Sequence, residues 1–134
     1  MEVAAVATVA SPEYRLTIAV KPTYVHAKVE GARTPENAAR FLRVAHEACI
    51  SAGRTAVLME MHLSGPSLGT INIFHVISQA SPRGAMLRRI GYVDTFEGEP
   101  DAPRFAETVA KNRGVNVRLF EDLASADRWL SEDS

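Results

Sequence analysis

The stretch GPSLG at positions 65–69 matches the pattern G-x-S-x-G, in which the serine of many hydrolases is the nucleophile. In those enzymes the serine stands on a sharp turn between a strand and a helix. The apolar run TAVLMEM before this stretch predicts a strand, and the run TINIFHVISQA after it predicts a helix. The local context therefore fits a nucleophile at Ser67, and the question is whether a catalytic base accompanies it.

A hydrolase of this kind needs a histidine that follows the serine in the chain. The histidine that follows Ser67 is His75, eight residues later in the next predicted helix. At 1.5 Å per residue the two are about 12 Å apart along the helix axis, which is too far for a hydrogen bond. His26 and His62 precede the serine and would have to form a triad of another order. We therefore expect no enzyme, and we interpret Ser67 or Thr70 as a helix cap.

Glu60 and His62 stand two residues apart in the predicted strand, so both side chains should lie on one face. Together with His75 or His26 they would make a His/Glu metal site. The alternative is that Glu60 pairs with a basic residue while the histidines lie at the hydrated end of the strand. We expect neither a metal nor another cofactor.

The Gly/Ser/Pro loop after this strand is the candidate binding loop. It lacks the lysine of a phosphate-binding P-loop and has a different spacing. Ligands of open α/β sheets bind near the carboxyl ends of the strands, where this loop should lie. The binding loop comprises Ser64, Gly65, Pro66, Ser67, Gly69 and Thr70, and the polar residues of an adjacent pocket would be Glu60, His62, Asn72 and His75.

Composition and charge narrow the class of protein. The chain has 134 residues, of which 46% are hydrophobic and 23% charged, as in one soluble globular domain. A net charge of −1 gives no basic surface for nucleic acid, and no apolar run reaches the ~18 residues of a membrane span. Residues 1–13 are Ala-rich and lack a basic start, which predicts a loose tail before a single domain at 14–134 in the cytoplasm.

Strands and helices alternate along the chain. Thr34 and Pro35 are typical of a helix start, and Ser81–Gly84 should end the helix that begins after the binding loop. Residues 56–61 are nearly all apolar, as in a central strand that is covered on both faces. The order β-β-α-β-α-β-α-β-α predicts an α/β fold, a mixed sheet with a parallel core and an antiparallel first hairpin.

This order, combined with four stretches of sequence, resembles the SpoIIAA-like proteins of the STAS clan, named for sporulation anti-sigma factor antagonists. The stretches are YVHAKVEGARTPENAARF, TAVLMEMHLSGPSLGTINIFHVI, RIGYV and NRGVNVRLFEDLASADRWL, and the resemblance covers roughly Tyr14 to Leu130. It implies one domain in which helices alternate along a sheet, with no catalytic machinery. It also implies a regulatory module that binds partner proteins or, in some members, nucleotides or lipids.

The resemblance further implies a regulatory serine. In the anti-sigma factor antagonists a partner kinase phosphorylates a serine in a D-S-x-G-like turn at the start of the second helix. Ser67 is the nearest counterpart by position and Ser64 the second, but no aspartate precedes either of them. We therefore expect a recognition loop, and Ser67 is the phosphosite that the resemblance implies.

The expected function is thus a non-enzymatic regulatory or protein-binding module of STAS type. The alternative is a protein that binds a small ligand, a lipid or a nucleotide, because TINIFHVI is apolar enough to line a pocket. A metal-dependent or serine hydrolase is the remote alternative. Aromatic residues on the outer faces of the strands at 24–30 and 115–120 favour a homodimer, so the partner would be another protein or a second copy.

Overall fold

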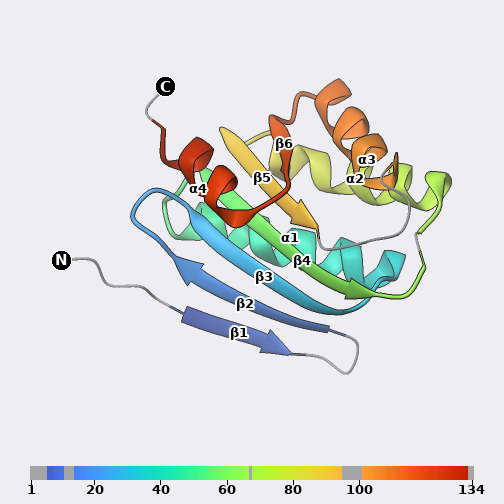
Figure 1. Cartoon of the computed structure of the whole chain (residues 1–134), viewed down its shortest axis with the longest axis horizontal. Coiled ribbons are helices and arrows are strands. Elements are labelled where there is room, and N and C mark those ends of the chain that lie inside the picture. The colour runs from blue at the N-terminus through green and yellow to red at the C-terminus, as the bar shows by residue number, and fades with distance from the viewer. Residues whose placement is uncertain (1–5, 11–13, 67, 95–100, 133–134) are drawn as a thin grey trace.

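The computed structural model describes residues 6–10, 14–66, 68–94 and 101–132. Within these residues the chain forms one six-stranded sheet and four helices (Figure 1). The strands are β1 (Val6–Ala10), β2 (Tyr14–Val20), β3 (Val25–Ala32), β4 (Ala56–Ser64), β5 (Arg89–Asp94) and β6 (Val117–Phe120). The helices are α1 (Pro35–Ser51), α2 (Thr70–Gly84), α3 (Asp101–Asn112) and α4 (Leu123–Ser131). The predicted α/β class with a mixed sheet is confirmed.

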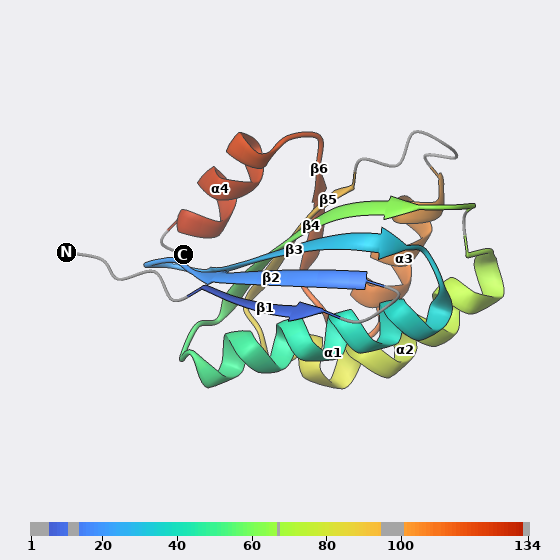
Figure 2. The same ribbon diagram turned by 90° about the horizontal axis from the view of Figure 1, so that it is seen from below.

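The strands lie in the sheet in the same order as in the chain. Strand β2 pairs antiparallel with both β1 and β3, and the pairs from β3 to β6 are parallel. Each parallel connection carries one helix, and right-handed crossovers that always advance in the same direction put their helices on the same face. Figure 2 accordingly shows α1, α2 and α3 together on one side of the sheet and α4 on the other.

The first crossover helix begins where the sequence predicts. Thr34 is the N-cap of α1, its hydroxyl accepts a hydrogen bond from the backbone N–H of Asn37, and Pro35 occupies the first turn. The apolar side of α1 packs on the sheet, with Phe41, Ala45 and Cys49 almost fully buried. Among the described residues no helix is long and apolar enough to cross a membrane.

Strand β4 lies inside the sheet and is covered on both faces. Val57, Met59 and Met61 belong to the core beneath α1, α2 and α3, whereas Leu58 points to the opposite face and packs against α4. This explains why the run at 56–61 shows almost no polar alternation.

Helix α4 covers only part of the second face. Leu130 and Ala126 pack there against Tyr24, Leu58 and neighbouring residues. Gly91 lets the helix come close, because a Cβ at this position would lie 3.1 Å from a methyl carbon of Leu130. The remainder of that face, over β2 and β3, carries polar side chains such as His26 and Lys28.

The prediction of a loose tail over residues 1–13 is wrong for Val6–Ala10, which forms β1. This strand pairs antiparallel with β2, with Thr8 opposite Thr17. Two valines and a threonine among these five residues favour a strand, and pairing with β2 supplies its hydrogen bonds.

The second helix ends at the last residue of the predicted segment and not at its start, because α2 includes Ser81–Gly84. Pro82 stands in the last turn, where a proline removes only one backbone hydrogen bond of the helix. The hydroxyl of Ser81 donates to the carbonyl of Ile77 in this segment. Strand β5 begins five residues after the end of α2, at Arg89.

Candidate functional site

Glu60 lies between two histidines on the face of the sheet opposite α1, α2 and α3. Nε2 of His26 lies 2.7 Å from one carboxylate oxygen, and Nε2 of His62 lies 2.6 Å from the other. The Glu60 side chain is 12% exposed, compared with 22% for His26 and 35% for His62. An ionised carboxylate only accepts hydrogen bonds, so both rings present Nε2–H to it and keep Nδ1 as an acceptor when neutral.

The strand register builds this cluster. Glu60 and His62 are alternate residues of β4, and Glu60 is paired with Lys28 of the parallel strand β3, two residues after His26. The predicted common face of Glu60 and His62 is therefore confirmed, and His26 joins them. His75 does not, because α2 crosses the other face of the sheet. His75 is exposed there and stacks edge-on against Phe74, with ring centroids 5.8 Å apart.

Two opposing effects set the pKa of Glu60. Burial is the largest and favours the neutral acid, but the hydrogen bonds from His62 and then His26 favour the carboxylate. The balance leaves the pKa of Glu60 below its ordinary value. The cluster thus holds a carboxylate in its charged form near neutral pH and fixes the orientation of two imidazoles.

Glu60→Gln is expected to lower the free energy of unfolding by about 1 kcal/mol at pH 7, because a charge-assisted pair of hydrogen bonds becomes a neutral one. The stabilising effect of Glu60 is present above the unfolded-state pKa and is lost as the pH falls through the lower folded-state pKa. Urea unfolding of both proteins should therefore show a difference at pH 7 that shrinks as the pH falls below the ordinary glutamate pKa of about 4.5. A difference that stays constant over this range would contradict the assignment.

Arg33, just beyond the end of β3, fixes the loop that follows β4. One guanidinium nitrogen donates to the carbonyl of Gly65, and the other donates to that of Leu63 across 3.1 Å. The backbone N–H of Arg33 donates to the carbonyl of Ser64 across 2.8 Å. The role of Arg33 was not predicted from the sequence, because it depends on the parallel pairing of β3 with β4.

The described residues of the predicted binding loop lie together at the carboxyl end of β4, but the predicted cap is wrong. The N-cap of α2 is Gly69, with φ +85° and no side-chain hydrogen bond, and Thr70 is the first residue of the helix. Ser64, Gly65, Pro66, Gly69 and Thr70 are exposed. Ser67 lies outside the described residues, so its role as the phosphosite that the resemblance implies stays a prediction.

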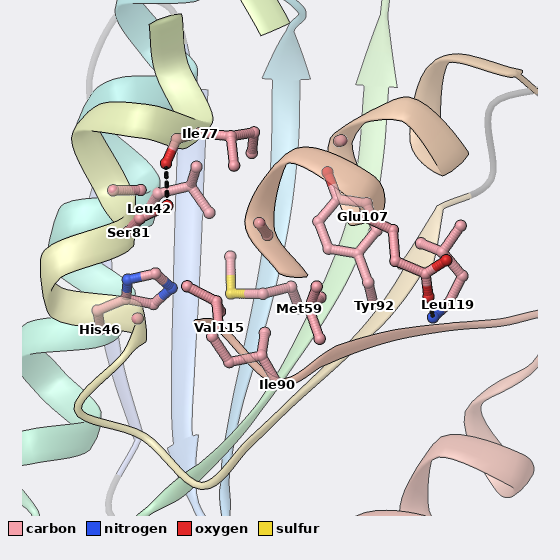
Figure 3. Close-up of a pocket in the computed structure, with 15 residues that line it drawn as sticks. Leu42, His46, Met59, Ile77, Ser81, Ile90, Tyr92, Glu107, Val115 and Leu119 are labelled. Atoms are coloured by element: carbon pink, nitrogen blue, oxygen red, sulfur yellow. Dashed lines mark hydrogen bonds between the residues drawn. The ribbon is translucent and has the colours of Figure 1, made fainter. Parts of the chain in front are cut away.

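A cavity of about 50 Å³ lies elsewhere, between the sheet and the three helices α1, α2 and α3 (Figure 3). Its lining includes Leu42 and His46 of α1, Ile77 and Ser81 of α2, and Ala106 and Ala110 of α3. None of the four polar residues of the predicted pocket, Glu60, His62, Asn72 and His75, lines it. In open α/β sheets a ligand crevice forms at the carboxyl ends of the strands where the strand order reverses, because the helices there lie on opposite faces. The parallel strands β3 to β6 follow one another without such a reversal, so they create no crevice of this kind.

The polar residue that sequence reasoning missed in this cavity is His46. It is only 3% exposed, and burial, followed by the nearby charge of Arg83, lowers its pKa to about 4. The signal was its position in α1, four residues after Leu42 and three before Cys49, on the buried stripe of the helix.

The aromatic residues that favoured a homodimer are covered within the chain. Tyr24 is buried and donates its hydroxyl hydrogen bond to Asp127 of α4 across 2.6 Å. Phe120 packs against Trp129 of the same helix, with ring centroids 5.5 Å apart. The homodimer stays a prediction, but these residues no longer support it.

The residues of the cluster around Glu60 use both carboxylate oxygens for hydrogen bonds to imidazole. In the described parts of the chain, no group of three His, Cys, Asp or Glu side chains is arranged to hold a metal ion. No family model matches the chain, and no curated protein sequence matches it either.

Proposed function

We propose that this chain is a non-enzymatic binding module of the SpoIIAA-like, STAS type, which recognises a partner protein in the cytoplasm. The recognition surface consists of the loop 63–70 and the first turns of α2. The observation that carries the proposal is the exposure of large apolar side chains directly after this loop: Ile71 is 73% exposed and Phe74 is 41% exposed.

These two side chains form one patch. They are three residues apart in α2, so they are neighbours on the same side of the helix. The guanidinium of Arg113 lies 4.7 Å from the centre of the Phe74 ring and extends the patch. Aromatic and arginine side chains dominate the binding energy of protein interfaces. The partner expected is therefore a protein with an apolar pocket and a carboxylate within reach of Arg113.

The described residues of the adjoining loop are fixed on both sides of Ser67, which suits a recognition surface. Gly65 and Gly69 have φ values of +97° and +85°, which favour glycine, and Arg33 binds two of the loop carbonyls. A loop held in this way loses little conformational entropy when a partner binds.

The positions of the histidines support a function other than hydrolysis. His26 and His62 bind Glu60 on the far side of the sheet, and His46 is buried beneath α2. His75 belongs to the patch side of α2, where its ring stacks with Phe74. A general base must lie within hydrogen-bond reach of its nucleophile. The four histidines, which are the candidate bases, lie in different parts of the molecule.

Ile71→Asp is expected to weaken partner binding at least tenfold, because it places a charge in the apolar patch. A photo-crosslinking amino acid at position 71, introduced in the cells that express the protein, should capture the partner for identification by mass spectrometry. The purified partner is then titrated calorimetrically with the wild type and with Ile71→Asp.

Met86→Asp is the matched control, since Met86 is 66% exposed and lies beyond the other end of α2. It should change the affinity less than twofold. Equal binding by Ile71→Asp and the wild type would contradict the proposed surface. Capture of a second copy of the chain would identify the patch as a self-association interface instead.

A further inference from the structure

The cavity among α1, α2 and α3 holds a buried imidazole whose hydrogen-bonding capacity is unused. Among the described residues, neither ring nitrogen of His46 has a hydrogen-bond partner. Figure 3 shows the ring at one end of the lining residues, directed toward Val115. Buried polar groups in native proteins almost always have a partner, so these two nitrogens need an explanation.

We propose that this cavity is a binding site for a small uncharged alcohol, whose hydroxyl group hydrogen-bonds His46 while its carbon chain packs among the apolar side chains. The site is separate from the proposed partner surface and does not depend on it. Met59, Ile90 and Val115 supply the apolar walls around the imidazole, and Ile77 extends them from α2 (Figure 3).

The ligand should carry no charge. Four polar side chains line the cavity: His46, Ser81, Tyr92 and Glu107. Apart from His46, two of them have a partner within the chain and the third is uncharged. The hydroxyl of Ser81 donates to the carbonyl of Ile77 across 2.6 Å. The carboxylate of Glu107 accepts from the backbone N–H of Leu119 across 3.1 Å and lies 3.6 Å from Nζ of Lys111. Burial also raises the pKa of Tyr92, which keeps its phenol neutral.

A hydroxyl group suits a neutral imidazole better than a pure donor or a pure acceptor does. Neutral His46 has one N–H donor and one acceptor nitrogen, and a hydroxyl can both donate and accept. It therefore satisfies whichever ring nitrogen faces it. The lowered pKa of His46 keeps the ring neutral at pH 7. The ring can therefore either donate a hydrogen bond to the hydroxyl group or accept one from it at physiological pH.

The size of the cavity restricts the carbon chain. A water molecule requires roughly 10–15 Å³ on this measure, so about 50 Å³ accommodates about four water-sized groups. 1-Propanol, with three carbons and one oxygen, is the probe of matching size. Ala106 and Leu119 are only half-buried, so the lining reaches the surface beside α3.

The test compares 1-propanol with 1-chloropropane, which has the same number of heavy atoms and no hydroxyl group. Methyl NMR spectra of the full chain at pH 7 should show saturable shifts of Ile77, Ile90 and Val115 with 1-propanol. His46→Leu should weaken 1-propanol binding about tenfold, the effect of one buried hydrogen bond, and leave 1-chloropropane binding unchanged or stronger.

A second readout uses the wild-type protein and avoids any effect of the substitution on folding. The ¹⁵N signals of the His46 ring should move when 1-propanol is added and stay in place with 1-chloropropane. Ala106→Leu, which fills the cavity from α3, should abolish the binding of both probes. Unsaturable shifts with 1-propanol, or a His46 ring that does not respond to it, would overturn the proposal, as would full 1-propanol affinity in His46→Leu. Ile71→Asp should bind 1-propanol normally, which separates this site from the partner surface.

Discussion

Acidification from pH 7 to pH 4 is expected to lower the free energy of unfolding by about 3 kcal/mol through His46 alone. The cause is a pKa of about 4 in the folded protein against an ordinary value of 6.5, with burial as the main effect and the positive charge of Arg83 as the second. The neutral ring is favoured in the folded state, whereas the unfolded chain takes up a proton near pH 6.5.

The sign follows from where each state binds the proton. Above pH 6.5 His46 is unprotonated in both the folded and the unfolded state, so it does not make the free energy of unfolding depend on pH. Between pH 6.5 and about 4 the unfolded state binds the proton and the folded state does not, so stability falls as the pH falls. Below about pH 4 both states are protonated and the loss is complete. Glu60 adds a further loss only below about pH 4.5, because its folded-state pKa lies below that value.

His46→Leu is the matched variant, since it removes the titrating group and keeps an apolar side chain on the same helix face. Urea unfolding between pH 4 and 8 should give a sloping free energy for the wild type and a nearly flat one for the variant down to about pH 4.5. The ring signals of His46 in NMR should report the folded-state pKa directly. Parallel pH profiles for the two proteins would show that His46 ionises normally in the folded state.

The charged groups around His46 are placed so that they do not reverse this effect. Arg83 of α2 is paired with Glu47 of α1 across 3.1 Å, at the exposed side of the two helices. Glu107 of α3 lines the same cavity, but Lys111 lies beside it. The other residues that line the cavity with His46, among them Ser81 and Val115, carry no charge. Nothing described around the ring offers the fixed negative charge that would favour imidazolium.

Local patterns predict much of this fold. The all-apolar run of β4, the cap at Thr34 and the common face of Glu60 and His62 depend on nearest neighbours in the sequence. The choice between His26 and His75 depends instead on which face of the sheet α2 crosses. Right-handed crossovers put α2 opposite Glu60, so topology and not spacing decides that the cluster includes His26.

Long-range packing decides what the sequence alone did not predict. The short strand β1 depends on pairing with β2, and the cavity depends on how α1, α2 and α3 meet over the sheet. His46 lies on the apolar side of α1, between Leu42 and Cys49, so its burial could have been predicted from the sequence. Neither of its ring nitrogens has a hydrogen-bond partner in the described part of the chain, and this depends on residues 35 or more positions away, such as Ser81 and Val115.

Leu130→Ala is expected to lower the free energy of unfolding by about 3 kcal/mol, within the range for buried leucine. Leu130 is 3% exposed and fills the space above Gly91 and Leu58, where α4 meets the sheet. Urea unfolding should report the loss. Helix α4 has nine residues, too few to be stable without packing, so loss of this contact should also release the helix from the sheet.

Trp129 gives a probe of that release, because it is the single tryptophan of the chain and lies in α4. Its ring contacts Phe120 and the guanidinium of Arg89, which lies 5.4 Å from the ring centre. In Leu130→Ala, tryptophan fluorescence should therefore change at lower urea than the far-UV circular dichroism, whereas the two transitions coincide in the wild type. Leu123→Ala makes the same substitution in the same helix at a residue 40% exposed and should cost less than about 1 kcal/mol. Equal losses in the two variants would mean that α4 is held by its polar contacts, such as Tyr24 with Asp127, and not by the burial of Leu130.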